Sequence, residues 1–245
     1  MATPTRLERP AFYALRPGGW RDALTLLHPP YTAWHLSYVA IGAAAASHLY
    51  GYRLVWTLVA FFLGVGVAAH ALDELHGRPL GTRLSDRALV IAAAVSLTGA
   101  GAIGVVGAMT ISLSLFVFVG VGVTLTLTYN LELFGGRMHS DVWFALAWGA
   151  FPALTAYWTQ AAELRVDAMF VAGACFMLSV AQRRLSTPVR ELRRRTLWVR
   201  GEKRLKDGSA SEIDAGGIAA PMESALMACS LGLALLAAGL VAARL

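Results

Sequence analysis

Long runs of apolar residues, separated by short polar stretches, dominate the pattern along this chain. A helix needs roughly 17–25 mainly apolar residues to cross a bilayer, and runs of this kind recur through most of the sequence. The pattern therefore predicts an all-α fold, a polytopic membrane helix bundle with about seven transmembrane helices. The predicted spans are residues 33–50, 54–74, 88–107, 110–130, 142–160, 165–183 and 222–243.

Composition supports the same class, because 57% of the residues are hydrophobic and only 15% are charged. An ordinary soluble domain has about 45–50% apolar and about 25% charged residues. Cys175 and Cys229 both fall inside predicted spans, so we expect small packed apolar side chains and no disulfide framework. The segment before the first span contains Glu8, Pro10 and Asp22 and does not resemble a signal peptide, so no cleavage is expected.

The spans divide the chain into four parts. Residues 1–32 form an N-terminal cytoplasmic or interfacial segment, residues 33–183 a six-helix membrane core, residues 184–221 a cytoplasmic loop, and residues 222–245 a C-terminal transmembrane helix. The first half of the loop is basic and could continue as a surface helix after Pro188. Its second half, "DGSASEIDAGG", has the composition of a flexible linker.

The distribution of positive charge predicts the orientation. If the N-terminus is cytoplasmic, 18 of the 21 Lys and Arg residues lie in inside segments, and only Arg53, Arg165 and Arg244 lie outside. Positive residues concentrate in cytoplasmic loops, so we expect a multi-pass protein of the cell membrane with a cytoplasmic N-terminus. The net charge of +6 then mostly reflects the Lys and Arg residues that orient the protein in the membrane. It does not suggest a nucleic-acid partner, although membrane lipids would be attracted to the basic loop.

Polar side chains gather at the predicted cytoplasmic ends of the second, fourth and sixth spans. The outside turns are short and carry little chemistry, so any site is expected to face the cytoplasm. The gathered residues are His70, Asp73, Glu74 and His76; Tyr129, Asn130 and Glu132; and Gln182, Arg183 and Arg184.

The acidic residues of this group suggest a metal site. His70, Asp73 and Glu74 stand at i, i+3 and i+4, so a continuous helix places them near one face. Carboxylates suit Mg²⁺, which prefers oxygen ligands and often takes substrate phosphate as well. Two other interpretations stay open: the carboxylates lie in interfacial water and pair with Arg78 or Arg83, or the same residues and His76 bind zinc.

The arginines at the end of the sixth span also have two interpretations. Arg183, Arg184 and Arg190, with the run 193–195, could cradle a phosphate, because the guanidinium fork matches phosphate oxygens. The same residues could equally anchor the cytoplasmic loop.

Three segments together resemble the UbiA superfamily of intramembrane prenyltransferases. They are "HPPYTAWHLSYVAIGAA" around the first span, "RPLGTRLSDRAL" after the acidic end of the second, and "YNLELFGGRMHSD" between the fourth and fifth. The resemblance runs from about residue 28 to residue 184. It implies a helical bundle with a cytoplasmic cavity, in which Mg²⁺ and aspartate-rich motifs hold a prenyl diphosphate for transfer to a lipophilic acceptor.

The resemblance also implies roles for individual residues. Asp73 matches the first acidic motif and Arg78 the phrase that follows it, while Tyr129 and Arg137 match the loop between spans four and five. The candidate site is thus catalytic Asp73 and Glu74; metal ligands Asp73, Glu74 and His70; and diphosphate ligands Arg78, Tyr129, Arg137, Arg183 and Arg184.

The chain departs from the family pattern at both motifs. Ala69 and His70 replace the first pair, Asn-Asp, of the first motif, and Gly77 replaces its last acid. Arginine stands where the second motif should have carboxylate, and seven spans are fewer than the usual nine. A divergent enzyme could use one metal at Asp73 and Glu74, with Arg183 and Arg184 as the second clamp. A prenyl-lipid-binding or assembly protein without catalytic activity, and a small transporter, are the alternative functions.

Overall fold

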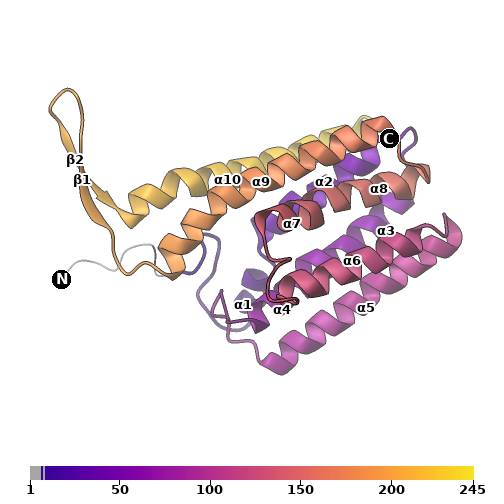
Figure 1. Ribbon diagram of the computed structural model, residues 1–245, viewed down its shortest axis with the longest axis horizontal. Helices are drawn as coiled ribbons and strands as arrows, with labels where there is room; N and C mark the ends of the chain where they lie inside the picture. The colour runs from indigo at the N-terminus through magenta and orange to yellow at the C-terminus, as the bar shows by residue number, and fades with distance from the viewer. Residues whose placement is uncertain (1–6, 8) are drawn as a thin grey trace.

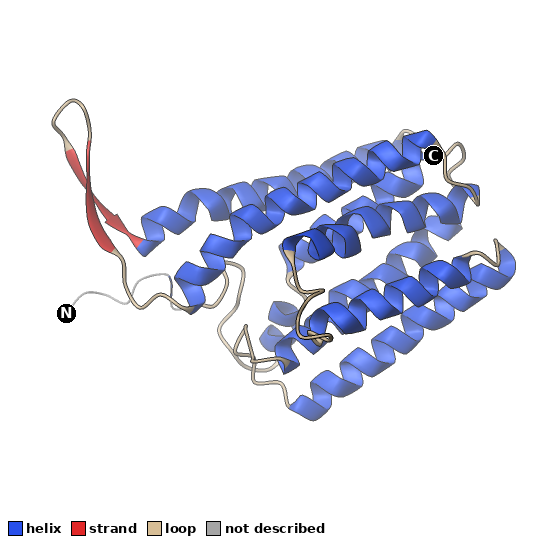
Figure 2. Ribbon diagram, in the orientation of Figure 1, coloured by secondary structure: helices blue, strands red, loops and turns tan. Residues whose placement is uncertain are grey.

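The computed structural model describes residue 7 and residues 9–245, and most of them are helical (Figures 1 and 2). Arg6 and Glu8, which entered the sequence arguments above, lie outside the described residues. The elements in chain order are α1 (Trp20–Leu26), α2 (Pro29–Ala45), α3 (Gly51–Phe61), η2 (Phe62–Ala69), α4 (His70–Leu75), α5 (Asp86–Thr110), α6 (Leu115–Asn130), α7 (Asp141–Ala145), η3 (Leu146–Ala150), α8 (Phe151–Ala161), α9 (Val166–Arg194), β1 (Arg200–Arg204), β2 (Ala210–Asp214) and α10 (Ala215–Ala242).

The helical bundle and its membrane character agree with the sequence. Within the described chain, four helical stretches are long and apolar enough to cross a membrane: Gly51–Leu75, Asp86–Thr110, Val166–Arg194 and Ala215–Ala242. The helix α6 is apolar but shorter. Helices also occupy the other predicted spans, and the count of seven membrane crossings stays a prediction.

The helix α2 forms the centre of one half of the bundle. Trp34, Tyr38 and Val39 on this helix are fully buried, and α2 packs most extensively against α10 and α8. In Figure 1, α9 and α10 form a long antiparallel pair on one side, while α5 and α6 form another pair on the opposite side. Because α2 also contacts α3 and α9, most of this relatively short helix is covered by protein.

A glycine permits the close contact between α2 and α8. A Cβ atom built on Gly42 would lie 2.2 Å from the carbonyl oxygen of Ala153, which is far inside van der Waals contact. Small residues allow such close backbone approach between helices in membranes. The α2–α8 pair therefore depends on the absence of a side chain at position 42.

The loop between α9 and α10 differs from the expected flexible linker. The helix α9 continues through Pro188 to Arg194, and residues 200–214 form an antiparallel β-hairpin, drawn in red in Figure 2. The pairing places Arg200 opposite Asp214 and Arg204 opposite Ala210. The helix α10 begins at Ala215, and the Asp214 carboxylate caps it by accepting a hydrogen bond from the Gly217 amide at 2.6 Å.

The two cysteines have different environments. Cys175 packs in the core beside Trp34 and Tyr38, as expected. Cys229 lies on an exposed side of α10, so the prediction of a packed side chain is wrong there. Neither cysteine forms a disulfide.

Substitution of Gly42 tests the α2–α8 contact. We expect Gly42→Ala to lower the free energy of unfolding by about 1–3 kcal/mol, because the added methyl overpacks the interface. Gly173→Ala on α9 is the matched control, since a Cβ atom there meets no neighbouring atom. Thermal unfolding of the purified protein in detergent measures both, and equal stability of the two variants would contradict this account.

Candidate functional site

A polar cavity of about 240 Å³ lies at one end of the bundle. It collects residues from the segment before α1, from the start of α2, from α4, from the α6–α7 loop and from α9. The polar ends that were predicted for the second, fourth and sixth spans therefore contribute residues to a single cavity. Its titratable and amide side chains are Tyr13, His28, Tyr31, His35, His70, Asp73, His76, Tyr129, Asn130, Glu132, His139, Gln182, Arg183, Arg190 and Arg194.

Histidine is the most unusual component of this lining. Five of the six histidines in the chain line the cavity, and only His48 lies elsewhere, on the exposed turn between α2 and α3. Ionisable side chains within membrane segments are costly and generally face protein or water-filled cavities. Their concentration here marks this end of the bundle as the candidate functional site.

His28 is held in an uncommon conformation at the start of α2. It has φ 46° and ψ 58°, a left-handed conformation that is rare for residues other than glycine, and it precedes Pro29 and Pro30. Its Nδ1 lies 2.7 Å from the Tyr13 hydroxyl, and its ring stacks on His70 with centroids 4.1 Å apart. The residue is only 7% exposed, and its Nε2 atom has no hydrogen-bond partner. A second buried atom, Oε1 of Gln182, also lacks a partner in the same cavity.

Burial dominates the electrostatics of His28. Loss of hydration, reinforced by His70 and the positive charges of Arg194 and Arg190, holds the pKa of His28 well below its usual range. The imidazole is therefore neutral at physiological pH. Its free nitrogen is available to a ligand.

Two other histidines hold the π-helical segments η2 and η3. His70 Nδ1 donates to the Gly66 carbonyl at 3.0 Å, and His35 Nδ1 donates to the Trp148 carbonyl at 2.8 Å. A carbonyl can only accept, so Nδ1 carries the proton in both rings. Short π-helical segments within α-helices often occur at functional sites.

Arginines on one face of α9 supply the positive charge. Arg183, Arg190 and Arg194 recur at intervals of seven and four residues, which places them on the same side of a helix, and all three line the cavity. Arg183 pairs with Asp141 at 2.9 Å, whereas Arg190 and Arg194 have no carboxylate partner within the described chain. Arg190 donates to the Thr187 hydroxyl at 3.2 Å and Arg194 to the Pro10 carbonyl at 3.1 Å. Of the arginines that were predicted to cradle a phosphate, these three line the cavity.

The remaining arginines of this region point elsewhere. Arg184 is exposed and does not line the cavity. Arg193 forms an ion pair with Glu223 on α10, with Nη2 and Oε2 2.9 Å apart. These residues fit the alternative role of anchoring the end of α9.

The acidic pair predicted as a metal site is divided between two environments. Asp73 lines the cavity. Glu74 is fully buried beneath the following loop, where its carboxylate accepts from the Leu80 amide at 2.9 Å and from the Thr82 amide and hydroxyl, each at 2.8 Å. Adjacent helical positions point in different directions, which separates the two carboxylates.

These positions bear on the metal hypothesis. Within residues 7 and 9–245, no three His, Cys, Asp or Glu side chains converge as metal ligands. Asp73, Glu74 and His70 therefore do not fit a three-ligand centre. Asp73 is the one member of the expected pair that could contact a cation inside the cavity.

The segment "RPLGTRLSDRAL" builds the loop that closes over Glu74. Arg78 donates to the Leu84 carbonyl at 2.6 Å and forms an ion pair with Asp86. Ser85 then caps α5 by accepting from the Ala88 amide at 3.2 Å. Arg78 does not line the cavity, so its contacts in the structure are those of a loop-forming residue.

The loop after α6 contributes one of its two predicted ligands. Tyr129 lines the cavity and stacks on His139, with ring centroids 4.5 Å apart. Arg137 is exposed and does not line the cavity. Glu132 lies 3.8 Å from both His76 and His139, at the cavity rim.

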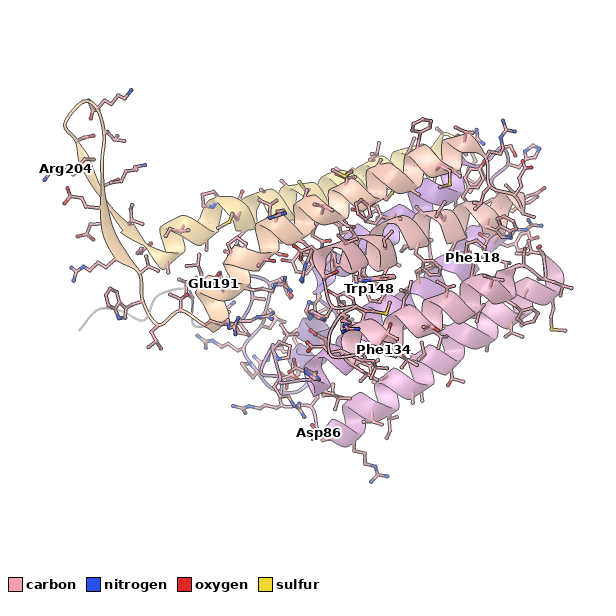
Figure 3. All side chains as sticks on the ribbon, viewed as in Figure 1. Asp86, Phe118, Phe134, Trp148, Glu191 and Arg204 are labelled. Carbon is pink, nitrogen blue, oxygen red and sulfur yellow. The ribbon has the colours of Figure 1, made fainter. Side chains whose placement is uncertain are left out.

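A larger apolar cavity of about 630 Å³ adjoins the polar one. It is lined by α3, η2, α5, α6, η3 and α8, and includes Phe118 and Phe151. Val65 of η2 and Trp148 of η3 line both cavities, so the two meet at these residues. Figure 3 shows Trp148 in the middle of the bundle, with Phe118 toward the far end.

Several site residues were not among those singled out from the sequence. Tyr13, His28, Tyr31, His35 and His139 all line the cavity. The three histidines, His28, His35 and His139, could have been found from the sequence. Each is near a helix end or inside an apolar helix, where an ionisable group is unusual. The spacing of Arg183, Arg190 and Arg194 was a second unused signal.

No family model, curated protein or solved structure matches the chain. The fold and site by themselves define a class: a helical bundle with four helices long and apolar enough to cross a membrane within the described chain, in which a basic, histidine-rich cavity adjoins an apolar one.

The burial of His28 predicts a pH-dependent stability. The folded state keeps this imidazole neutral, whereas the unfolded chain protonates it below about pH 6.5. The unfolded state then binds more protons, so the free energy of unfolding falls as the pH drops, by up to about 1.4 kcal/mol per pH unit. We expect His28→Gln to reduce this slope, and His48→Gln to leave it unchanged. Thermal unfolding between about pH 7.5 and about pH 5.5 measures the slopes, and parallel slopes for all three proteins would contradict the prediction.

Proposed function

We propose that this protein is a divergent membrane prenyltransferase that binds a prenyl diphosphate across the two adjoining cavities. The junction at Val65 and Trp148 carries the proposal. A prenyl diphosphate has a strongly anionic head and a long hydrocarbon chain, and a basic cavity beside an apolar one matches both parts. The resemblance of residues 28–184 to the UbiA superfamily supports the same ligand class.

The arginine face of α9 is the proposed diphosphate site. Arg183, Arg190 and Arg194 would bind phosphate oxygens through charge-assisted hydrogen bonds, which are stronger than neutral ones. Tyr129 and Asp73 lie in the same cavity, where Asp73 would contact any cation that accompanies the diphosphate. The apolar cavity would hold the isoprenyl chain away from water.

Transfer would begin with cleavage of the bond between the allylic carbon and the diphosphate oxygen, which keeps the electron pair. The arginines would stabilise the charge that develops on the leaving group, a form of stabilisation that is often the largest single contribution to catalysis. The acceptor then forms a bond to the allylic carbon and loses a proton, which the released diphosphate or water would take up.

The proposed topology has seven crossings, with the polar cavity on the cytoplasmic side. The residues that line the cavity come from the segments that the distribution of Lys and Arg assigns to the inside and from the adjoining parts of the predicted spans. The described parts of these segments lie at one end of the bundle (Figure 3). A cytoplasmic site would also have direct access to soluble prenyl diphosphates.

One observation favours a second candidate, binding of a prenyl lipid without turnover. Both oxygens of Glu74 are engaged by the loop, so only one carboxylate of the expected catalytic pair faces the ligand. Loss of one transition-state stabiliser commonly lowers the rate by about 10²–10³. The same cavities would then serve as a lipid-binding site.

Ligand binding tests the site that both candidates share. We expect saturable binding of a non-hydrolysable geranylgeranyl diphosphate analogue to the protein in lipid nanodiscs, measured with and without Mg²⁺. Arg190→Ala should weaken binding about tenfold or more, because it removes hydrogen bonds to a charged group. Arg184→Ala, an exposed neighbour on the same helix, is the matched control and should bind normally. Absence of binding by folded protein would overturn the proposed function.

Turnover separates the two candidates. Proteoliposomes supplied with geranylgeranyl diphosphate and a native lipid extract should release diphosphate and form a prenylated lipid, and Asp73→Asn should reduce both. Ligand binding without diphosphate release would support the second candidate. Isothermal titration with the non-hydrolysable analogue provides the binding reference for each variant.

A further inference from the structure

The β-hairpin between α9 and α10 extends from the ends of two candidate membrane helices. Figure 1 shows the hairpin at the end of the bundle that holds α4, running across the direction of the long helices and past the outline of the bundle beside α9 and α10. Both neighbouring helices are long and apolar enough to cross a membrane. Their ends at the hairpin therefore lie near a membrane surface, and a hairpin that extends sideways from them lies over lipid.

The register of the hairpin gives it two chemically different faces. Side chains alternate between the faces of a strand, so the pairs Arg200–Asp214 and Glu202–Glu212 share one face with Arg204. This charged face carries all three acidic residues of the two strands. Arg204 contacts Glu202 on this face at 2.7 Å.

The opposite face carries a single positive charge and otherwise uncharged residues. It contains Lys203, Ser211 and Ile213, and Leu205 continues its alternation beyond β1. No acidic residue lies on this lysine face within the two strands. In Figure 3, Arg204 of the charged face is on the side of the hairpin away from the helices. The lysine face is consequently turned toward the side where the bilayer would lie.

Two large apolar residues precede the hairpin without protein cover. Leu197 is 98% exposed and Trp198 is 76% exposed. Tryptophan is enriched at membrane–water interfaces, where its ring lies at the level of the lipid head groups. A lysine in such a setting places its stem against apolar groups and its ammonium among phosphates.

We propose that the hairpin lies on an anionic bilayer surface, with its lysine face and Trp198 in contact with the lipid head groups. Three features carry this assignment: the position at the ends of two membrane helices, the exclusion of acidic residues from one face, and the uncovered apolar residues beside it. The partner is an anionic lipid surface because lysine without a neighbouring acid is the only charge on that face. This docking does not depend on the proposed prenyltransferase function.

A fluorescence scan of the hairpin tests the proposal. The background is the full chain with Cys175→Ala and Cys229→Ala, and single cysteines are introduced by Glu202→Cys, Arg204→Cys, Leu205→Cys and Ser211→Cys, which all keep Lys203. Each variant is labelled with an environment-sensitive dye and placed in vesicles containing a nitroxide-labelled lipid. Vesicles of phosphatidylcholine with phosphatidylglycerol in equal parts are compared with phosphatidylcholine alone.

The expected result differs between the two faces. Labels at 205 and 211 should be quenched about twofold more strongly than labels at 202 and 204, because only the lysine face contacts lipid. The difference should shrink in phosphatidylcholine alone and at high salt. Ile213→Glu, which places an acid on the lysine face, should abolish the quenching of a label at 205.

Other outcomes overturn the proposal. Equal, weak quenching at all four positions would place the hairpin in water, and stronger quenching at 202 and 204 would place the charged face on the membrane. Circular dichroism and size-exclusion chromatography of each labelled variant show that the bundle is folded. The labelled positions are exposed, so their labelling leaves the helical core intact, and the unlabelled background is checked in the same way because Cys175 is buried.

Discussion

Hydrogen bonding within a membrane is the constraint on which this structure depends. Lipid offers no partner to a free backbone carbonyl, so each one must be satisfied by the protein. The π-helical segments η2 and η3 break the regular α-helical pattern inside the bundle, and a histidine supports each of them. His70 donates to Gly66 within η2, and His35 donates from α2 to Trp148 within η3.

These bonds also position the junction between the cavities. Val65 and Trp148, which line both cavities, belong to the two supported segments. The π-helical segments η2 and η3 and the histidines that bond to them thus together position the point where the polar cavity meets the apolar one. His35 comes from the central helix α2, so the position of the junction is tied to the best-packed part of the protein.

The sequence predicted the fold better than the details of the site. The hydrophobic runs located the helices because burial in lipid demands long apolar stretches, and the polar helix ends did converge. The orientation of Glu74 could not be predicted from the sequence. Helical spacing placed it beside Asp73, but hydrogen bonds from Leu80 and Thr82 in the following loop determine where its carboxylate points. Such contacts depend on how the loop folds and not on the spacing within the helix. The hairpin was missed because its strands are polar on both exposed surfaces and its Gly and Ser residues are typical of a linker.

Electrostatics links the polar cavity to the ligand that it is proposed to bind. Arg190 and Arg194 face the cavity without carboxylate partners in the described chain, and Arg183 lines the same space. Like charges that converge at low dielectric repel one another strongly. Asp73 and Glu132 are the carboxylates among the described residues that line the cavity, and Asp141 pairs with Arg183. An anion placed among these guanidinium groups would relieve that repulsion and gain their hydrogen bonds. We therefore expect an anionic head group to stabilise this arrangement, and the adjoining apolar cavity is the reason for proposing an anion that carries a hydrocarbon chain.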